Sequence, residues 1–317
     1  MGRNQSSTRI AGIDVGKARL DVAVHGREDQ TQVANGPVGI GELIAWLRAR
    51  EVGRVGLEAS GGYEREARAA LQAAGFEVVL HQPLEVRLLA RLKRLRAKND
   101  KLDARLIAAA TAQVDTLRAA QDPRLVELAE RLTAYEQASA KAAEIKTFLE
   151  SLQQIDVARD FRRLLAATLR LKAKLAREIF DRIKAEPDLK ARLRLLLSLT
   201  GIGPIVAASL VIRMPELGAL RRGQAAALLG VAPFDRDSGQ WKGQRFIAGG
   251  RARPRRMLYM AALAARRCDP RLKAFADNLA ARGKPAKLII VAVMRRLIED
   301  ANLVLSRGTP WLRTVTA

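Results

Sequence analysis

The sequence has few of the residue types on which several enzyme classes depend. It contains 317 residues but a single cysteine, Cys268, and two histidines, His25 and His81. One cysteine excludes a disulfide framework within the chain and a zinc site built from cysteines. A zinc-dependent HNH nuclease and a histidine-based relaxase need more histidines than this chain has. A tyrosine recombinase needs arginine and histidine around its nucleophile, but both histidines lie in the N-terminal third.

Long apolar runs and aromatic residues are also scarce. No segment reaches about 18 uninterrupted apolar residues, the length that spans a bilayer. The N-terminus does not resemble a signal peptide, so we expect a cytoplasmic protein that associates with the nucleoid. Aromatics make up 4% of the chain although 49% is hydrophobic, so leucine, alanine, valine and isoleucine must fill the core.

Acidic residues are outnumbered by basic ones. The chain has 56 Lys and Arg against 33 Asp and Glu, a formal charge of +23. Such an excess attracts polyanions, and neutralising phosphates releases counterions, so double-stranded DNA is the expected partner. A GC-rich genome that inflates arginine is the alternative, but arginine-rich chains of that origin are often balanced by acids and this one is not.

The first 120 residues alternate strand and helix patterns. Period-two alternation and turn residues predict two strands within 8–26, joined at Gly16-Lys17, and further strands at 54–58 and 76–80. Apolar residues with helical spacing predict helices over 39–50 and 63–74. This order predicts an α/β domain over residues 1–120, with a mixed sheet flanked by helices.

The rest of the chain reads as helical. Residues 123–186 lack glycine and carry leucine stripes, which predict two long helices or a coiled-coil pair. We expect residues 121–190 to form a linker and oligomerisation arm in a homodimer or homotetramer, although a plain helical bundle fits equally. Residues 191–317 predict a mainly α domain that opens on a helix, a Gly201-Ile202-Gly203-Pro204 turn and a second helix, resembling a helix-hairpin-helix.

Four carboxylates stand out against this background. Asp14 lies within an apolar strand pattern, Glu58 ends another, and Asp100 and Asp103 share one face of a predicted helix. If the strands are neighbours and the helix crosses their ends, the four acids meet and need a hard cation such as Mg²⁺, with Mn²⁺ as a substitute. Taken singly, each has an ordinary explanation as a turn cap, an exposed strand end or a helix N-cap.

The segments that carry these acids are AGIDVGKARLDVAV, GLEASGGYE and KNDKLDARLIA. They resemble the three blocks of the RuvC-like, DEDD-type insertion-sequence transposases, a family that includes the Piv-type DNA invertases. Later segments, LTGIGPIVAASL among them, extend the resemblance over nearly the whole chain. It implies an N-terminal RuvC/RNase H-like catalytic domain and a C-terminal transposase domain, with Asp14, Glu58, Asp100 and Asp103 as the metal-binding tetrad.

The same resemblance implies a nucleophile and a guide. Ser238, in the Asp237-Ser238-Gly239 turn, matches a serine that attacks the DNA backbone, although from the residues alone it reads as a turn serine. We expect metal bound by the tetrad to activate it, since a hydroxyl needs activation and no histidine lies nearby in the sequence. Better-understood relatives imply an element-encoded RNA as guide and second nucleic-acid partner.

Glycines and basic residues of the last third are the candidate nucleic-acid contacts. Backbone N–H groups at a Gly-rich turn before a helix can bind phosphate, and arginines near Ser238 can hold the backbone, although a charge run is often only a solvated face. The candidates are Gly201, Gly203, Lys242, Arg245, Arg251, Arg253, Arg255 and Arg256. Trp241 and Phe246 could stack on bases, or simply pack.

Three functions remain open from the sequence. The first is a recombinase that uses the tetrad and Ser238. The second is a purely hydrolytic RuvC-like junction nuclease, which has no use for Ser238. The third is a non-catalytic basic protein that binds DNA, for which the four acids are dispensable.

Overall fold

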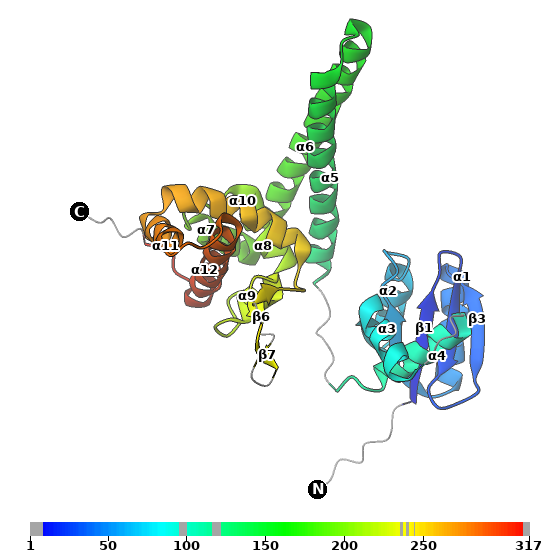
Figure 1. The fold of residues 1–317 in the computed structure, drawn as a ribbon. Coiled ribbons are helices and arrows are strands. Elements are labelled where there is room, and N and C mark those ends of the chain that lie inside the picture. Colours follow the sequence, from blue (N-terminus) through cyan, green and yellow to red (C-terminus); the bar gives the residue numbers. More distant parts are fainter. Residues whose placement is uncertain are drawn as a thin grey trace. The chain divides into compact units, whose positions relative to one another are not determined.

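The computed structural model describes residues 9–94, 100–115, 122–234, 237–238, 241–243 and 245–312. The chain divides into two compact units, Met1–Ala120 and Gln121–Ala317, which are described separately (Figure 1).

A five-stranded sheet forms the centre of the first unit, in the order β3-β2-β1-β4-β5. The strands are β1 (Arg9–Val15), β2 (Arg19–Val24), β3 (Gln30–Ala34), β4 (Val52–Glu58) and β5 (Glu77–His81). Strands β1, β2 and β3 pair antiparallel, because short connections join them. Strands β4 and β5 run parallel to β1, since each is reached through a helix. The predicted mixed sheet is confirmed.

Helices cover both faces of this sheet: α1 (Pro37–Ala49), α2 (Arg65–Ala73), α3 (Pro83–Leu92) and α4 (Asp100–Thr111). Successive strand residues point to opposite faces. Ile13 and Leu57 therefore face the core that also contains Leu43 of α1 and Leu71 of α2. The alternate residues of the same strands face α4.

Two glycines allow α4 to lie directly on the sheet. A Cβ atom on Gly12 would overlap the backbone of Ala104 and Ala108, and one on Gly56 would overlap the Thr111 hydroxyl. The backbone of α4 thus occupies the space that side chains would otherwise take at these positions. The helix is thereby held across β1 and β4.

Long helices open the second unit, as predicted. Helices α5 (Pro123–Ser151) and α6 (Ile155–Ala185) pack as an antiparallel hairpin that projects from the rest of this unit (Figure 1). The remaining helices are α7 (Pro187–Leu197), α8 (Pro204–Arg213), α9 (Gln224–Leu229), α10 (Ala252–Cys268), α11 (Pro270–Ala281) and α12 (Ala286–Arg307). Four two-residue strands lie between α9 and α10: β6 (Pro233–Phe234), β7 (Asp237–Ser238), β8 (Trp241–Lys242) and β9 (Phe246–Ile247).

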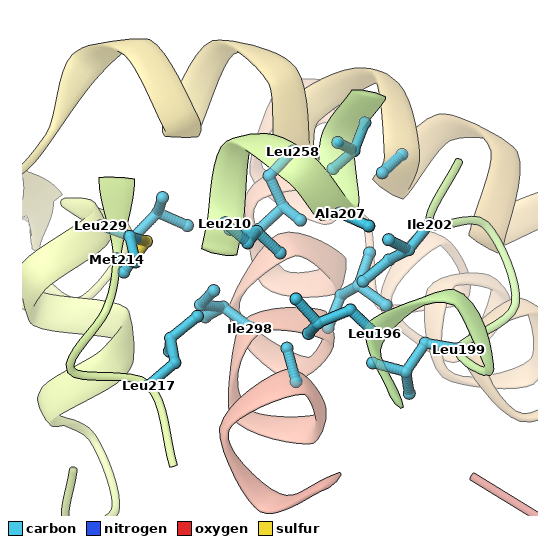
Figure 2. Close-up of a cluster of buried hydrophobic side chains, with 14 of the residues drawn as sticks. Leu196, Leu199, Ile202, Ala207, Leu210, Met214, Leu217, Leu229, Leu258 and Ile298 are labelled. Atoms are coloured by element: carbon cyan, nitrogen blue, oxygen red, sulfur yellow. The ribbon is translucent and has the colours of Figure 1, made fainter. Parts of the chain in front are cut away.

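An aliphatic core joins the helices of the second unit. Leu196 of α7, Leu210 of α8 and Ile298 of α12 are fully buried in it, and Figure 2 shows how such side chains meet. Gly201 has a φ of +94°, and a Cβ there would overlap Ala265 of α10. The turn before α8 is therefore packed tightly against the next layer.

No helix in the described part of the chain is both long and apolar enough to cross a membrane.

Candidate functional site

Asp14 and Glu58 stand at the ends of neighbouring parallel strands. The β1–β4 register pairs Gly12 with Gly56 and Ile13 with Leu57, and Asp14 and Glu58 come next on the two strands. Adjacent strands lie about 4.8 Å apart. Because Gly12 and Gly56 both face α4, the alternation of side chains puts Asp14 and Glu58 on that same face.

Helix α4 brings a third carboxylate to this face. Ala104 lies over Gly12, and Asp103 precedes it on the helix. Arg105, two positions on, projects about 200° around the helix from Asp103. Its Nη2 is 3.0 Å from Oε2 of Glu28, which follows β2 and lies beyond the start of β1. Asp103 therefore lies on the opposite flank, toward the strand ends that carry Asp14 and Glu58.

Asp100 is the first residue of α4, one helical turn before Asp103 and Ala104. Its side chain lies outside the described residues. Among the side chains that are described, no group of three or more acids, histidines or cysteines is arranged so that it could hold a metal ion. The donor chemistry nevertheless suits Mg²⁺, since carboxylate oxygens are the ligands this cation prefers.

The turn between β1 and β2 forms a hollow that Asp14 lines. Its lining runs from Asp14 through Gly16, Lys17 and Arg19 to Asp21. Two basic side chains thus border the carboxylates. This combination can receive a phosphate, whose charge the basic groups offset, next to acids that bind a cation.

Asp21 is a carboxylate that the sequence interpretation missed. It is the cross-strand partner of Asp14, so both side chains lie on the same face of the sheet. It is only 7% exposed, accepts a hydrogen bond of 2.7 Å from Nε2 of Gln32, and lies 3.4 Å from Nε of Arg19. The signal was available, since Asp21 interrupts an apolar strand just as Asp14 does.

Glu64 fixes the turn that follows Glu58. Its carboxylate accepts hydrogen bonds from the Gly62 N–H at 2.8 Å, the Ser60 N–H at 3.1 Å and the Ser60 hydroxyl at 3.0 Å. Burial acts to raise the pKa of Glu64, but the backbone N–H groups and the Ser60 hydroxyl outweigh it and hold that pKa below its usual value. The second glutamate of GLEASGGYE thus shapes the loop beside the site.

A buried histidine lies next to Glu58 in the sheet. His81 is the register partner of Glu58 on β5, is 3% exposed, and its Nε2 lies 2.9 Å from the Thr111 hydroxyl on α4. The Thr111 hydroxyl donates to the Ile107 carbonyl at 2.7 Å. The sequence interpretation considered His81 only as a possible activator of Ser238 and set it aside, because it lies far from that serine along the chain.

The second unit holds the candidate serine on a small hairpin. Ser238 on β7 pairs with Trp241 on β8. The side chains of Ser238, Trp241 and Lys242 lie outside the described residues, and Phe246 on β9 is exposed. Gly203 is the N-cap of α8 with nothing within 4 Å of a Cβ built there, whereas Gly201 packs against α10.

Three of the candidate arginines contact other parts of the second unit. Arg251 forms an ion pair of 2.6 Å with Glu216, Arg253 one of 2.7 Å with Glu136, and Arg255 donates to the Gly249 carbonyl. These three guanidinium groups are held by other parts of the same unit. Arg245, Arg253 and Arg256 have exposed side chains, so all three are accessible to a nucleic acid.

Comparisons with known proteins cover most of the chain. A family model of IS110 DEDD transposases, described as a transposase, matches residues 11–155. A second, described as "Transposase IS116/IS110/IS902 family", matches residues 193–277. The pilin gene-inverting proteins of Moraxella bovis and Moraxella lacunata are each 25% identical to this chain, over 96% of it and 98% of the relative.

A solved structure, that of RuvC from Thermus thermophilus, is similar to part of the chain. It is 19% identical and the match covers 33% of this chain and 93% of that one, with a TM-score of 0.26. So low a score adds nothing to the strand order, which the hydrogen-bond registers establish.

Proposed function

Because this chain belongs to the IS110 family of transposases, we propose that it cleaves and rejoins DNA strands with a carboxylate-bound divalent metal and a serine nucleophile. The observation that carries this proposal is the arrangement of Asp14, Glu58 and Asp103. They come from three separate elements on the α4 side of the sheet, and Asp14 lines a hollow together with Lys17 and Arg19.

The acids would bind the cation together with Asp100. Bound there, a divalent cation supplies positive charge that makes an attacking hydroxyl more acidic and stabilises a departing oxygen. Lys17 and Arg19 would position the phosphate, and Asp21, through its bond to Gln32, would keep the β2 side of the site rigid.

Ser238 is the proposed nucleophile. Its Oγ attacks the phosphorus, a bond between phosphorus and a deoxyribose oxygen breaks, and the serine proton passes to solvent as the departing oxygen takes one up. The phosphate is then held on the serine, and attack by a second deoxyribose hydroxyl rejoins the strand and regenerates Ser238. Such covalent storage conserves the energy of the phosphodiester, which hydrolysis would release.

The basic residues of the second unit would have two different roles, one in protein structure and one in phosphate binding. Arg251, Arg253 and Arg255 would hold the start of α10 against other parts of the second unit, through the contacts described above. Lys242, Arg245 and Arg256 would contact phosphates, as would the N–H groups of the Gly201–Gly203 turn. DNA is the partner that family membership implies, and an element-encoded RNA is the guide we propose for choosing the site.

We also propose that the helical hairpin joins copies of the chain. Leu164 and Leu171 of α6 are 51% and 50% exposed and lie seven residues apart, the spacing of a coiled-coil seam. Strand exchange needs at least two active sites, which a homodimer or homotetramer supplies.

The decisive test is to trap the covalent intermediate. A plasmid carrying the DNA from both sides of the gene is incubated with protein, Mg²⁺ and RNA from the same region, and then resolved under denaturing conditions. We expect a protein–DNA adduct that disappears with a chelator and in Ser238→Ala. Nicks without an adduct, equally frequent in Ser238→Ala, would establish the hydrolytic nuclease instead. Binding without nicking, unchanged in Asp14→Asn, would establish a non-catalytic protein.

A further inference from the structure

His81 and Thr111 form a buried polar contact between the sheet and α4. The two side chains are 3% and 0% exposed, and they come from β5 and from the last residue of α4. Buried polar groups are costly unless they are hydrogen-bonded. If these two residues only filled the space between β5 and α4, apolar side chains would do so without that cost. The polar pair therefore needs a further explanation.

The hydrogen bonds define the direction of the contact. The Thr111 hydroxyl has one proton, and the Ile107 carbonyl at 2.7 Å accepts it. Its oxygen then accepts from Nε2 of the imidazole, while Nδ1 of His81 lies 3.6 Å from Oε2 of Glu85. The result is a chain of hydrogen bonds from His81 through Thr111 to the backbone of α4.

This chain of hydrogen bonds lies next to Glu58 in the sheet, at the opposite end of α4 from Asp100. His81 is the register partner of Glu58, and its carbonyl accepts from the N–H of Ala59, which follows Glu58. Thr111 also packs against Gly56, which lies two residues before Glu58. At its other end, α4 carries Asp103 and Asp100. One contact thus joins the strand that holds Glu58 to the helix that holds the last two acids.

We propose that His81 is a positioning residue. Its Nε2–H, through the Thr111 hydroxyl, sets where α4 lies along the sheet and so sets the separation between Asp103 and the pair formed by Asp14 and Glu58. This inference rests on the proposed function, because it assigns the contact a role at that site. Outer groups that orient metal ligands are commonly worth about 10- to 100-fold in metal affinity.

The test measures Mn²⁺ binding by the full-length protein without DNA, using the electron paramagnetic resonance signal of the free ion. We expect His81→Asn, His81→Leu and Thr111→Val to weaken binding by about 10-fold or more. Conservative changes should preserve it: His81→Gln keeps an N–H near the position of Nε2, and Thr111→Ser keeps the hydroxyl. His81→Leu with Thr111→Val should lose no more than either change alone, since both break the same contact.

The matched control is Thr168→Val in α6. The Thr168 hydroxyl also donates to a carbonyl one turn earlier, that of Leu164 at 2.8 Å, but it lies in the other unit. It should leave Mn²⁺ binding unchanged. Thermal unfolding of each variant identifies those that fold, and His81→Asn, which retains a polar side chain, carries the test if His81→Leu does not fold.

Two outcomes separate this inference from the proposed function. Native Mn²⁺ affinity in folded His81→Asn, alongside lost affinity in Asp14→Asn, would overturn the role of His81 and leave the metal site standing. Native Mn²⁺ affinity in Asp14→Asn would overturn the metal site itself, and this inference with it.

Discussion

The two units of the chain use charged residues in different ways. In the first unit, acids from β1, β4 and α4 reach one face of the sheet, although 44 residues separate the first two along the sequence. In the second, the candidate phosphate contacts come from one contiguous basic stretch, yet Arg251 and Arg253 are paired with Glu216 and Glu136. Acids far apart in the sequence thus lie on one face of the sheet, whereas arginines close together in the sequence contact different partners. Proximity in sequence is a poor guide to common function when the tertiary structure supplies alternative partners.

The largest expected effect tests the acids of the first unit. Asp14→Asn removes a charged ligand but keeps the shape, and a loss of several kcal/mol of metal-based stabilisation corresponds to about 10³-fold in cleavage rate. Cleavage is measured on the plasmid substrate and DNA binding by filter retention. Asp115→Asn, an exposed acid of the same unit, is the control and should cleave normally. Equal cleavage rates for Asp14→Asn and Asp115→Asn would show that Asp14 is not needed for cleavage.

Glycine substitutions compare the packing of the two units. Gly12→Ala forces a Cβ into the backbone of α4, which cannot move without shifting Asp103, and should destabilise the first unit by about 3 kcal/mol. Gly203→Ala meets nothing within 4 Å and should leave stability nearly unchanged. Urea unfolding followed by circular dichroism measures both. A stable Gly12→Ala protein would show that α4 does not rest on β1 as described.

The arginines can be sorted by two separate measurements. Arg251→Gln should lower the free energy of unfolding by about 1 kcal/mol, a modest figure because solvent screens this partly exposed ion pair with Glu216. Arg256→Gln should leave the free energy of unfolding unchanged and weaken DNA binding. It should also lower the slope of the logarithm of the DNA-binding constant against the logarithm of salt concentration by about one, because one phosphate contact is lost. If Arg251→Gln changed the salt dependence and not stability, the division of tasks would be reversed.

The smallest effect concerns the loop after Glu58. Glu64→Gln removes a carboxylate that three donors hold, and should cost about 1 kcal/mol at pH 7. Because the pKa of Glu64 is lowered in the folded protein, its contribution is fully present above the ordinary glutamate pKa and is lost as pH falls through the folded value. Urea unfolding of both proteins should therefore differ at pH 7 and converge in acid. A difference that grows in acid would contradict the direction of the shift.

Much of the fold was accessible from the sequence because its signals are local. Alternation in residues 8–26 predicted β1 and β2, and the glycine-free leucine pattern predicted α5 and α6. The sequence predicted no bounds for strand β3, because residues 30–34 lie at the edge of the sheet and lack strong apolar alternation. The pairing of Asp21 with Asp14 was missed for another reason, because it depends on the register of the hairpin.

By itself, the sequence determined the chemical inventory: a basic chain that resembles one transposase family, with carboxylates in apolar strands and no histidine near the candidate serine. Residue types, charge and periodicity are properties of the chain alone. Only the tertiary structure decided that His81 contacts Thr111, and that Arg251 pairs with Glu216. Those outcomes depend on which surfaces packing brings together, because a side chain's role follows from its nearest partners, and these come from distant parts of the sequence.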